Sequence, residues 1–325
     1  MPGQIILPNI HSNSSNIYIT ERSVPIGIYK DIAYGNGIYV AVGNGYVINS
    51  KDTYLWSPCA VTTRDWNTIT FGNGYFIAIA LDGYVIRSAD GINWTSILDL
   101  YNKLNTDDSS SSIKDGIYEL TYGNGISSVL VGGWRSRYVY STNNGTTWTV
   151  TQTTDYYCNI AFGNNMWQMV AGGDDSSYHN KLSYSTNGIN YTSIDTTGSW
   201  YHGLDFLEEN NKFYSIMNIM NDGNKYSLVM KDSSPASAGG FNRIAGGVWI
   251  PHGAAGGIKN VAVKNSTNII VLSEEWPNVL SFTKDEGKTW SQLSMRINTE
   301  NVRCVNNTLF ILGGTPTEGF MATLV

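Results

Sequence analysis

Aromatic, acidic, basic and histidine side chains that could bind a sugar gather in the least regular segments of this 325-residue chain. Planar aromatic rings offer an apolar face to the C–H groups of a sugar, while neighbouring Asp, Asn and Arg side chains bind its hydroxyl groups. The predicted ligand-binding residues are Trp134, Arg135, Arg137, Asp174, Asp175, His179, Trp200, Tyr201, His202, Trp249, His252 and Trp276. The alternative is that each tryptophan only anchors its own loop.

Hydrolysis of a glycosidic bond needs two carboxyl groups that face each other about 5 to 9 Å apart. Neighbouring acidic residues usually mark solvated loop ends, and the sequence does not place any two of them opposite each other. We therefore predict no catalytic residue and keep a glycoside hydrolase as the main enzymatic alternative. The candidate acidic pairs are Asp107–Asp108, Asp174–Asp175, Glu208–Glu209 and Glu274–Glu275.

Metal and cofactor chemistry find no support in the spacing of residues. The four histidines lack the short spacings of metal-binding sites, and the sequence contains neither a Gly-x-Ser-x-Gly element nor a phosphate-binding loop. Cys59, Cys158 and Cys304 are far apart and odd in number, so we expect buried free thiols rather than a disulfide framework. The prediction is a protein without metal or cofactor.

The charge of the chain argues against two classes of partner. Only 14% of the residues are charged, the formal net charge is -6, and lysine and arginine form no cluster. Nucleic-acid binding needs several basic groups on one face, so we exclude it. No stretch approaches the roughly 18 apolar residues of a membrane span, and the N-terminus lacks the pattern of a signal peptide. We therefore expect synthesis in a cytoplasm and no membrane insertion.

A repeated sequence pattern indicates how these residues are positioned. An aromatic-Gly-Asn-Gly segment is followed, some two dozen residues later, by a turn of the form Ser-x-Asp/Asn-(x)-Gly-x-x-aromatic. Repetition at this length predicts a fold built from copies of one unit. The copies are Tyr34–Gly37 with Ser50–Trp56, Phe71–Gly74 with Ser88–Trp94, Tyr122–Gly125 with Ser141–Trp148, Phe162–Asn165 with Ser185–Tyr191, a weaker one from Phe206 to Asp232, and Thr283–Trp290.

The second copy predicts four antiparallel strands. Trp66–Phe71 reads as a strand, and the following Asn-Gly pair favours a type I′ hairpin, in which both central residues need positive φ. Tyr75–Ala80 is apolar on both faces, as expected for a strand between two layers. A third strand, Tyr84–Ser88, leads through the turn Ala89–Trp94 to a short fourth one. In that turn Asp is expected to cap backbone N–H groups, and Gly accepts the left-handed conformation.

Four-stranded units of this kind predict an all-β fold, a single β-propeller domain that spans residues 1–325. Strand starts at Tyr34, Phe71, Tyr122, Phe162, Phe206, Val263 and near Val305 give seven blades, with six or eight as alternatives. The last unit is too short for four strands. We expect a strand within Ile5–Thr20 to complete it and close the ring, and segment 1–25 to serve also in docking.

The predicted propeller assigns the binding residues to one face. The nearly uniform hairpins and Ser–Asp turns share one face, whereas the loops between second and third strands and the crossings between blades share the other. Variable loops on a rigid scaffold usually carry binding, so we place the ligand on the second face.

The turns Ser88-x-Asp-Gly-x-x-Trp94, Ser141-x-Asn-x-Gly-x-Thr-Trp148 and Thr283-x-Asp-x-Gly-x-Thr-Trp290 resemble the Asp-box (BNR) repeat of sialidases and of many bacterial and phage propellers. In that family the turns are structural, so the resemblance implies a propeller. The arginine triad and the Arg-Ile-Pro segment of sialidases have no counterpart here.

The undecorated Tyr-Gly-Asn-Gly form looks like propellers of phage tail and fibre proteins. The resemblance implies a virion protein, made in the host cytoplasm, that attaches to the host by binding surface polysaccharide and contacts other virion proteins. The alternatives are a glycoside hydrolase or depolymerase, and a purely structural decoration or adaptor protein.

Overall fold

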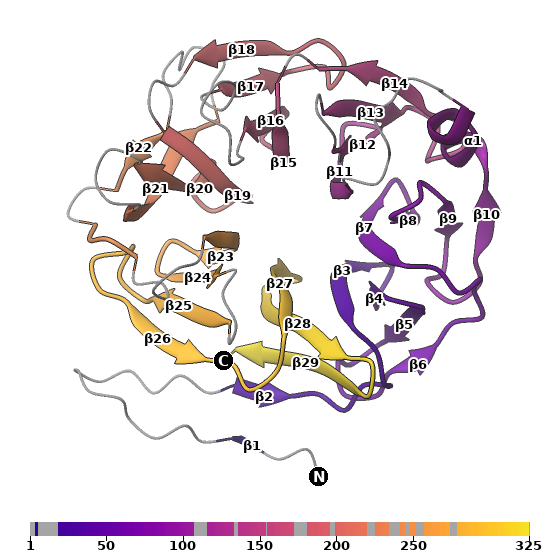
Figure 1. Ribbon diagram of the computed structural model, residues 1–325, viewed down its shortest axis with the longest axis horizontal. Coiled ribbons are helices and arrows are strands. Elements are labelled where there is room, and N and C mark those ends of the chain that lie inside the picture. The colour runs from indigo at the N-terminus through magenta and orange to yellow at the C-terminus, as the bar shows by residue number, and fades with distance from the viewer. Residues whose placement is uncertain are drawn as a thin grey trace.

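The computed structural model is a closed ring of seven β-sheets, a seven-bladed β-propeller (Figure 1). The predicted fold class and blade number are therefore confirmed. The structure describes residues 4–5, 19–106, 116–132, 136–153, 155–171, 181–195, 199–219, 225–233, 241–244, 247–250, 257–273 and 278–324.

In each blade the strands are antiparallel and the first one lies at the pore. Blades 1 to 3 are formed, from the pore outward, by β3 (Tyr29–Gly35), β4 (Ile38–Gly43), β5 (Tyr46–Ser50) and β6 (Ser57–Pro58); β7 (Trp66–Gly72), β8 (Tyr75–Ala80), β9 (Val85–Ser88) and β10 (Thr95–Ile97); and β11 (Ile117–Gly123), β12 (Ile126–Val131), β13 (Arg137–Ser141) and β14 (Thr149–Gln152). Blades 4 to 6 are formed by β15 (Tyr157–Gly163), β16 (Met166–Ala171), β17 (Lys181–Ser185) and β18 (Thr192–Asp195); β19 (Ser199–Leu207), β20 (Lys212–Ile219), β21 (Lys225–Asp232) and β22 (Asn242–Arg243); and β23 (Ile258–Asn265), β24 (Asn268–Ser273), β25 (Val279–Thr283) and β26 (Ser291–Ser294).

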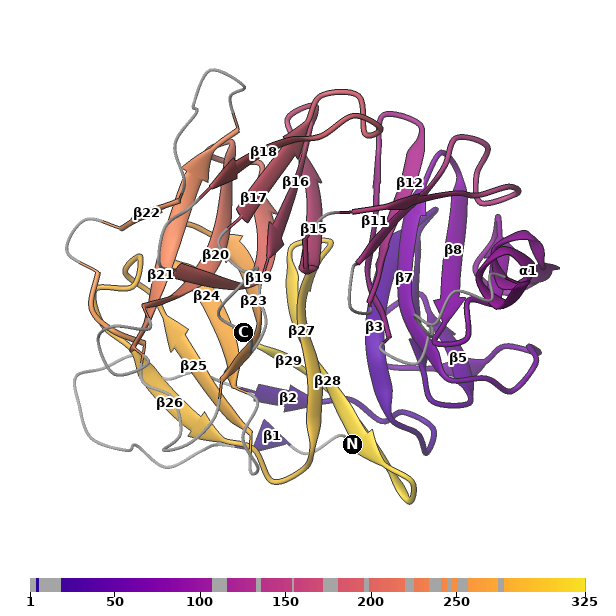
Figure 2. The ribbon, with the colours of Figure 1, turned by 45° about the horizontal axis from the view of Figure 1, so that its top comes forward.

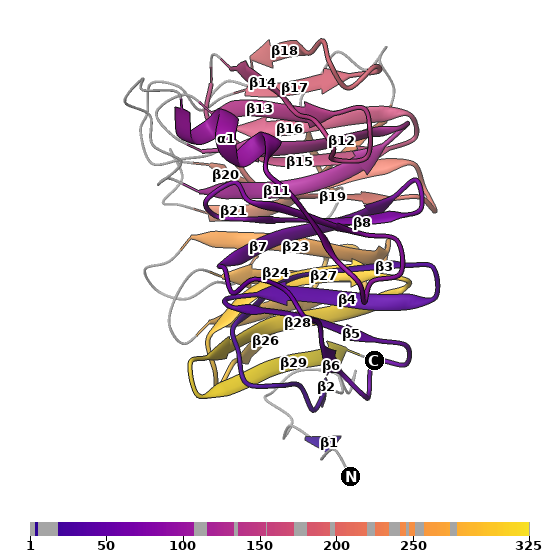
Figure 3. The same cartoon turned by 90° about the vertical axis from the view of Figure 1, so that its right-hand side faces the viewer.

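Blade 7 joins the two ends of the chain. It consists of β27 (Thr299–Val305), β28 (Thr308–Thr315), β29 (Glu318–Leu324), β2 (Ile19–Glu21) and β1 (Gln4–Ile5). β2 pairs with β29, with Ile19 opposite Leu324, and β1 lies outside β2 at the periphery (Figure 3). The expected closing strand within the N-terminal segment is thus confirmed.

The second strands form the most buried layer of the ring. Every residue of β4, β12 and β16 is buried, as the apolar pattern on both faces predicts. Their side chains and those of neighbouring strands pack into clusters between adjacent blades, for example Val40, Phe76 and Ile86 between blades 1 and 2. Burial between blades, rather than within one sheet, therefore holds the ring together.

The hairpins between first and second strands have the predicted type I′ geometry in five blades. Both central residues have positive φ, which Asn and Gly adopt most readily. The pairs are Asn36–Gly37, Asn73–Gly74, Asn124–Gly125, Asn164–Asn165 and Asn306–Asn307.

The glycine before each of the first four hairpins is in direct contact with an aromatic ring of the next blade. A Cβ atom added at these glycines would lie only 2.0 to 2.2 Å from the nearest ring atoms. The repeated aromatic-Gly pattern is therefore an interlock between blades, in which only glycine leaves room for the ring. The pairs are Gly35 with Phe71, Gly72 with Tyr122, Gly123 with Phe162, and Gly163 with Phe206.

The Ser–Asp turns between third and fourth strands are closed by their own side chains. In blade 2, the Gly91 N–H donates to Ser88 Oγ at 2.8 Å, and the N–H groups of Ile92 and Asn93 donate to Asp90 Oδ1 at 2.9 and 2.8 Å. Gly91 has φ +72°. The predicted mechanism of this turn is confirmed, and the same bonds recur around Ser50, Ser141, Ser185 and Thr283.

We expect Asp90→Ala to lower the free energy of unfolding by about 1 kcal/mol at pH 7, because two hydrogen bonds to backbone N–H groups are lost. Backbone and side-chain hydrogen bonds from Asn93 and Ile92 hold the pKa of Asp90 well below its usual range. A carboxylate with a lowered pKa stabilises the fold above its unfolded pKa, so the difference from wild type should begin to shrink as the pH falls below about 4 and vanish only where the folded state is protonated as well. Urea titrations at pH 7 and 3 test this, and an unchanged difference would contradict it.

One element, α1 (Asp99–Thr106), was not predicted, because the repeat indicated only strands and the loops that connect them. Leu100 and Leu104 are both buried, at the i, i+4 spacing of one helix face. Asp99 accepts the Trp148 N–H at 2.7 Å, which fixes the helix against blade 3 on the rim of the ring (Figure 2). No helix among the described residues is long and apolar enough to span a membrane.

Candidate functional site

One position in the middle of the first strands is polar in six of the seven blades, and most of its side chains bond to another blade. A β-bulge lies at or next to this position in every blade. Asp31 Oδ2 accepts hydrogen bonds from Thr68 Oγ1 and the Ile69 N–H, both at 2.9 Å, and Asn260 Nδ2 donates to Asn301 Oδ1 at 2.7 Å. The position is occupied by Asp31, Thr68, Glu119, Asn159, Gly203, Asn260 and Asn301.

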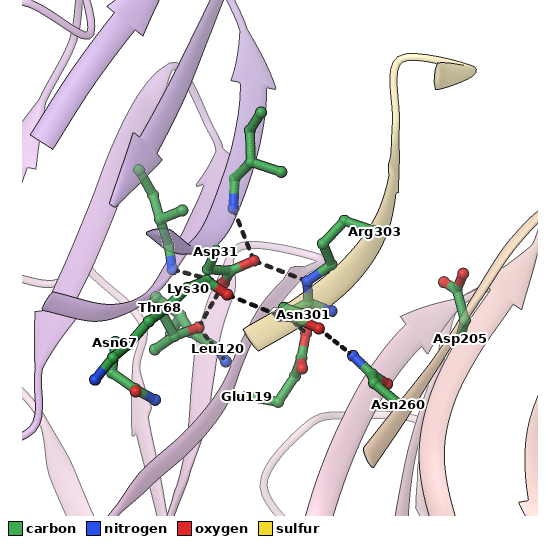
Figure 4. Close-up of polar contacts among 12 residues, drawn as sticks. Lys30, Asp31, Asn67, Thr68, Glu119, Leu120, Asp205, Asn260, Asn301 and Arg303 are labelled. Atoms are coloured by element: carbon green, nitrogen blue, oxygen red, sulfur yellow. Dashed lines mark hydrogen bonds and ion pairs between the residues drawn. The ribbon is translucent and has the colours of Figure 1, made fainter. Parts of the chain in front are cut away.

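Arg303 in β27 connects three blades across the pore (Figure 4). Its Nε donates to Asp31 Oδ1 of blade 1 at 2.7 Å, and its Nη2 pairs with Glu119 Oε1 of blade 3. The Asp31 side chain is 2% exposed, whereas those of Glu119 and Arg303 keep 14% and 18% of their surface exposed. The arginine thus neutralises two carboxylates, one of which still reaches the water of the pore.

Burial governs the ionisation of these groups. It raises the pKa of Glu119 to about 7, although Arg303 acts in the opposite direction, and it raises the pKa of Asp205 to about 6 against two backbone N–H bonds. Burial alone would lower the pKa of Arg303, but Asp31 and Glu119 raise it above its usual value. The arginine therefore stays charged, whereas burial brings the pKa values of Glu119 and Asp205 near neutral pH.

Above these charges lies a cavity of about 730 Å³, which we call the pore-mouth cavity. It opens on the face that carries the hairpins between first and second strands. Glu119, Asp205 and Arg303 lie at its inner end. Its outer lining consists of Glu208, Glu209, Lys264, Asn265, Asn306 and Asn307, from the hairpins of blades 5, 6 and 7.

The charged residues of the pore-mouth cavity depart from the repeated sequence pattern. The residue before the hairpin aromatic is small or threonine in five blades, but Asp205 in blade 5 and Arg303 in blade 7. The glycine of the interlock is replaced by Lys264 in blade 6. Sequence reasoning did not identify these residues, although an alignment of the seven first strands would have shown that they depart from the pattern.

Most of the predicted binding residues lie outside the described residues. These are Trp134, Arg135, Asp174, Asp175, His179, His252 and Trp276. The acidic pairs Asp107–Asp108, Asp174–Asp175 and Glu274–Glu275 lie outside them as well, whereas Glu208 and Glu209 line the pore-mouth cavity.

Trp200, Tyr201 and His202, which were predicted in a variable loop or at its edge, lie instead in the strand β19. The strand is nine residues long and pairs with β20 from Ser199 to Leu207. The regular part of blade 5 therefore includes residues that the sequence assigned to a loop. Tyr201 is buried against Phe241, with ring centroids 5.3 Å apart, and is thus part of the core.

The other described candidates do not meet at one place. Arg137 is buried at the start of β13. His202 is half-buried, its ring edge-on to that of Tyr226 at 5.7 Å. Trp249 is half-buried on the outer side of blade 5, where the Arg243 guanidinium lies 4.2 Å from its ring centroid. Of these three, Trp249 has the surroundings of a residue that could contact a ligand.

The described residues contain no group of three or more His, Cys, Asp and Glu side chains that could hold a metal ion. Cys59, Cys158 and Cys304 are free thiols, and they are half-buried rather than buried as expected. Burial raises the pKa of Cys304 to about 12, so this thiol at the pore mouth is not ionised at neutral pH.

Comparison with solved structures shows the fold class. The structure of YCF48 bound to D1 peptide has a TM-score of 0.65 and 16% identity over 97% of this chain and 98% of the other. YCF48 from Cyanidioschyzon merolae gives 0.66 and 14% over 94% and 98%, and the Cps50 (Swd1) propeller of Myceliophteria thermophila gives 0.62 and 8% over 99% of both. No family model and no curated protein sequence matches. The chain is thus a seven-bladed propeller that resembles YCF48 and WD40-type propellers.

Proposed function

We propose that this protein is a non-enzymatic recognition propeller of a phage particle that binds a host surface glycan in the pore-mouth cavity. The observation that carries the proposal is the cavity itself. Its volume of about 730 Å³ is typical of small-molecule sites. Amides, carboxylates and Lys264 offer donors and acceptors for hydroxyl groups, and the half-buried rings of Phe162 and Phe206 add apolar surface.

The phage assignment is supported by the resemblance of the Ser–Asp turns and Tyr-Gly-Asn-Gly hairpins to Asp-box and phage tail propellers. A solved neighbour of the same fold, YCF48, holds a peptide, so a propeller of this shape is compatible with recognition of a polymer. Host attachment would use such binding directly. The outer loops that carry the predicted aromatic residues stay a second contact region in this proposal.

A glycoside hydrolase is the second candidate, because the raised pKa values of Glu119 and Asp205 suit a general acid. The hydrogen bonds and the ion pair of these two carboxyl groups favour a binding protein over a hydrolase. Asp205 accepts the N–H groups of Phe206 and Val263 at 2.9 and 2.7 Å, and Glu119 is held by Arg303. Both carboxylates thus join one blade to another, as the side chains of Thr68 and Asn260 also do.

Removing one amide from the cavity should weaken glycan binding. Asn307 has φ +57°, so Asn307→Gly keeps the hairpin while it removes a side chain that lines the cavity. We expect the dissociation constant for the glycan to rise by about tenfold, as for the loss of one good hydrogen bond, with little change in the melting temperature. Asn165→Gly is the matched control, because it changes the same hairpin position in blade 4, away from the cavity. Equal losses in both variants would contradict the assignment of the site.

The decisive experiment is a screen of bacterial surface polysaccharides for binding to the purified protein, with an assay for released oligosaccharide between pH 5 and 8. Binding without release supports the proposal. Release of oligosaccharide would overturn it in favour of the hydrolase, and absence of binding to every polysaccharide would favour a structural virion protein.

A further inference from the structure

We propose that a second cavity, beside the pore mouth, binds an anionic group of the recognised polymer, a carboxylate or a phosphate. The choice of polymer rests on the proposed function, whereas the charge of the cavity does not. The cavity measures about 300 Å³. We call it the anion cavity, and the residues of its lining that matter here are Arg22, Lys51, Asp52, Lys264 and Asn307.

The anion cavity adjoins the pore-mouth cavity. Lys264 and Asn307 line both of them, so no other element separates the two at this point. From there the anion cavity extends outward to Arg22, which follows β2, and to Lys51, in the turn after β5. A polymer with one unit in the pore mouth would therefore place its neighbouring group beside these cations.

The side chains of the cavity are positive in a protein that is negative as a whole. Arg22, Lys51 and Lys264 face a single carboxylate, that of Asp52, while the chain carries a formal net charge of -6. Asp52 Oδ1 already accepts the N–H groups of Tyr54 and Leu55 at 2.8 and 2.9 Å. Asp52 therefore offsets only one of the three positive charges, and the side chains of the lining keep a net charge of +2.

Arg22 has no carboxylate partner among the described residues, unlike two other arginines. Its Nη2 donates to Thr323 Oγ1 at 2.6 Å, and its Nε and Nη1 are buried without an acceptor. The guanidinium lies 4.2 Å from the Tyr54 ring centroid, which covers one side of it. Arg296 and Arg303, in contrast, each pair with two carboxylates. A charged group left without a counter-ion is costly, and a ligand anion would supply one.

These observations define the class of ligand: a polysaccharide with acidic groups, rather than a neutral one. A carboxylate and a phosphate offer the same chemistry to an arginine and two lysines. Binding should also weaken as salt is added, since the lysine heads are accessible to ions.

The test compares polygalacturonate with its methyl ester, which has the same backbone without the charge, and with poly(glycerol phosphate). We expect one of the two polyanions to bind at least about tenfold more tightly than the ester, and Arg22→Met and Lys264→Met each to remove about tenfold of that affinity. Lys284→Met is the matched control: it removes the same charge from an exposed lysine of blade 6 and should leave binding within about twofold.

The outcomes separate this inference from the proposed function. Equal binding of polyanion and ester, or equal losses in all three variants, would overturn the anion cavity but leave glycan recognition intact. The protein could instead bind free galacturonate or inorganic phosphate in a way that needs Arg22, and bind no polysaccharide. That result would support the anion cavity and overturn the proposed recognition of a glycan.

One further arm examines the chain's own carboxylate. Leu324 lines the anion cavity, and Val325 follows it. The titration is therefore repeated on a protein with several residues appended after Val325. Equal anion binding by both forms supports the proposal, and binding only by the extended form would overturn it, because a carboxylate at residue 325 of the tested protein would then occupy the cavity.

Discussion

Replacing Arg303 with methionine is expected to lower the free energy of unfolding by about 3 kcal/mol at pH 8, because two carboxylates lose their shared counter-ion in a poorly hydrated place. Asp31 and Glu119 would then repel each other across the pore. Arg296→Met is the control, since Arg296 also pairs with two carboxylates but is 49% exposed, and it should cost less than about 1 kcal/mol. Similar losses in both variants would show that the pore pair is no stronger than a surface one.

The pH dependence gives a second check on Arg303. In the wild type the pKa of Glu119 is raised to about 7 by burial, and without Arg303 it should rise further. A carboxyl group with a raised pKa destabilises the fold progressively as the pH rises from its unfolded pKa, about 4, to the raised one, so the loss caused by Arg303→Met should be smaller at pH 5 than at pH 8. Adding Glu119→Gln should restore part of the stability at pH 8. Denaturant titrations at both pH values measure this, and a loss that does not vary with pH would contradict it.

The second large effect is expected at the interlock between blades. Gly123→Ala should lower the free energy of unfolding by about 3 kcal/mol, because its Cβ would lie 2.2 Å from the Phe162 ring. Gly125→Ala in the same hairpin is the control: nothing lies within 4 Å of a Cβ there, and only the φ of +84° penalises alanine, by about 1 kcal/mol. Thermal and urea unfolding compare the two.

The chain itself suggests how to rescue that variant. Between blades 5 and 6, a larger residue, Leu207, replaces the glycine, and a smaller one, Val263, replaces the aromatic; both belong to one buried cluster. The double variant Gly123→Leu with Phe162→Val should therefore be more stable than Gly123→Leu alone. If it is not, the glycine is required for a reason other than the ring that faces it.

The ring of blades could be predicted because its signals are local. An Asn-Gly pair requires positive φ at its own residues, and Ser88 and Asp90 close a turn with partners only two or three residues away. Such signals repeat with the chain and can be counted. The helix α1 was not predicted because Leu100 and Leu104 give only a weak apolar pattern within a polar segment. Contacts with blade 3, such as the bond from the Trp148 N–H to Asp99, stabilise this helix.

The candidate site was harder to predict, because its residues come from different blades. Asp31, Glu119 and Arg303 are distant in sequence, and the bulges of the first strands determine that they meet. Sequence reasoning looked for chemistry in the variable loops and attributed the hairpin face to the fold alone. The departures at Asp205 and Lys264 within otherwise uniform hairpins were the signal that it missed.

The seam between blades 7 and 1 has a consequence for how the protein matures. The contacts of this seam, such as Arg303 with Asp31 and Asn306 with Tyr39, and the pairing of Thr20 with Thr323 inside blade 7, join residues about 270 to 300 positions apart. They cannot form during synthesis until the last blade has left the ribosome. Arg303, Asn307 and Thr323 line the two cavities and belong to blade 7, so a chain that stalls before this blade would lack both cavities. Ligand binding would then occur only in molecules whose synthesis and ring closure are complete.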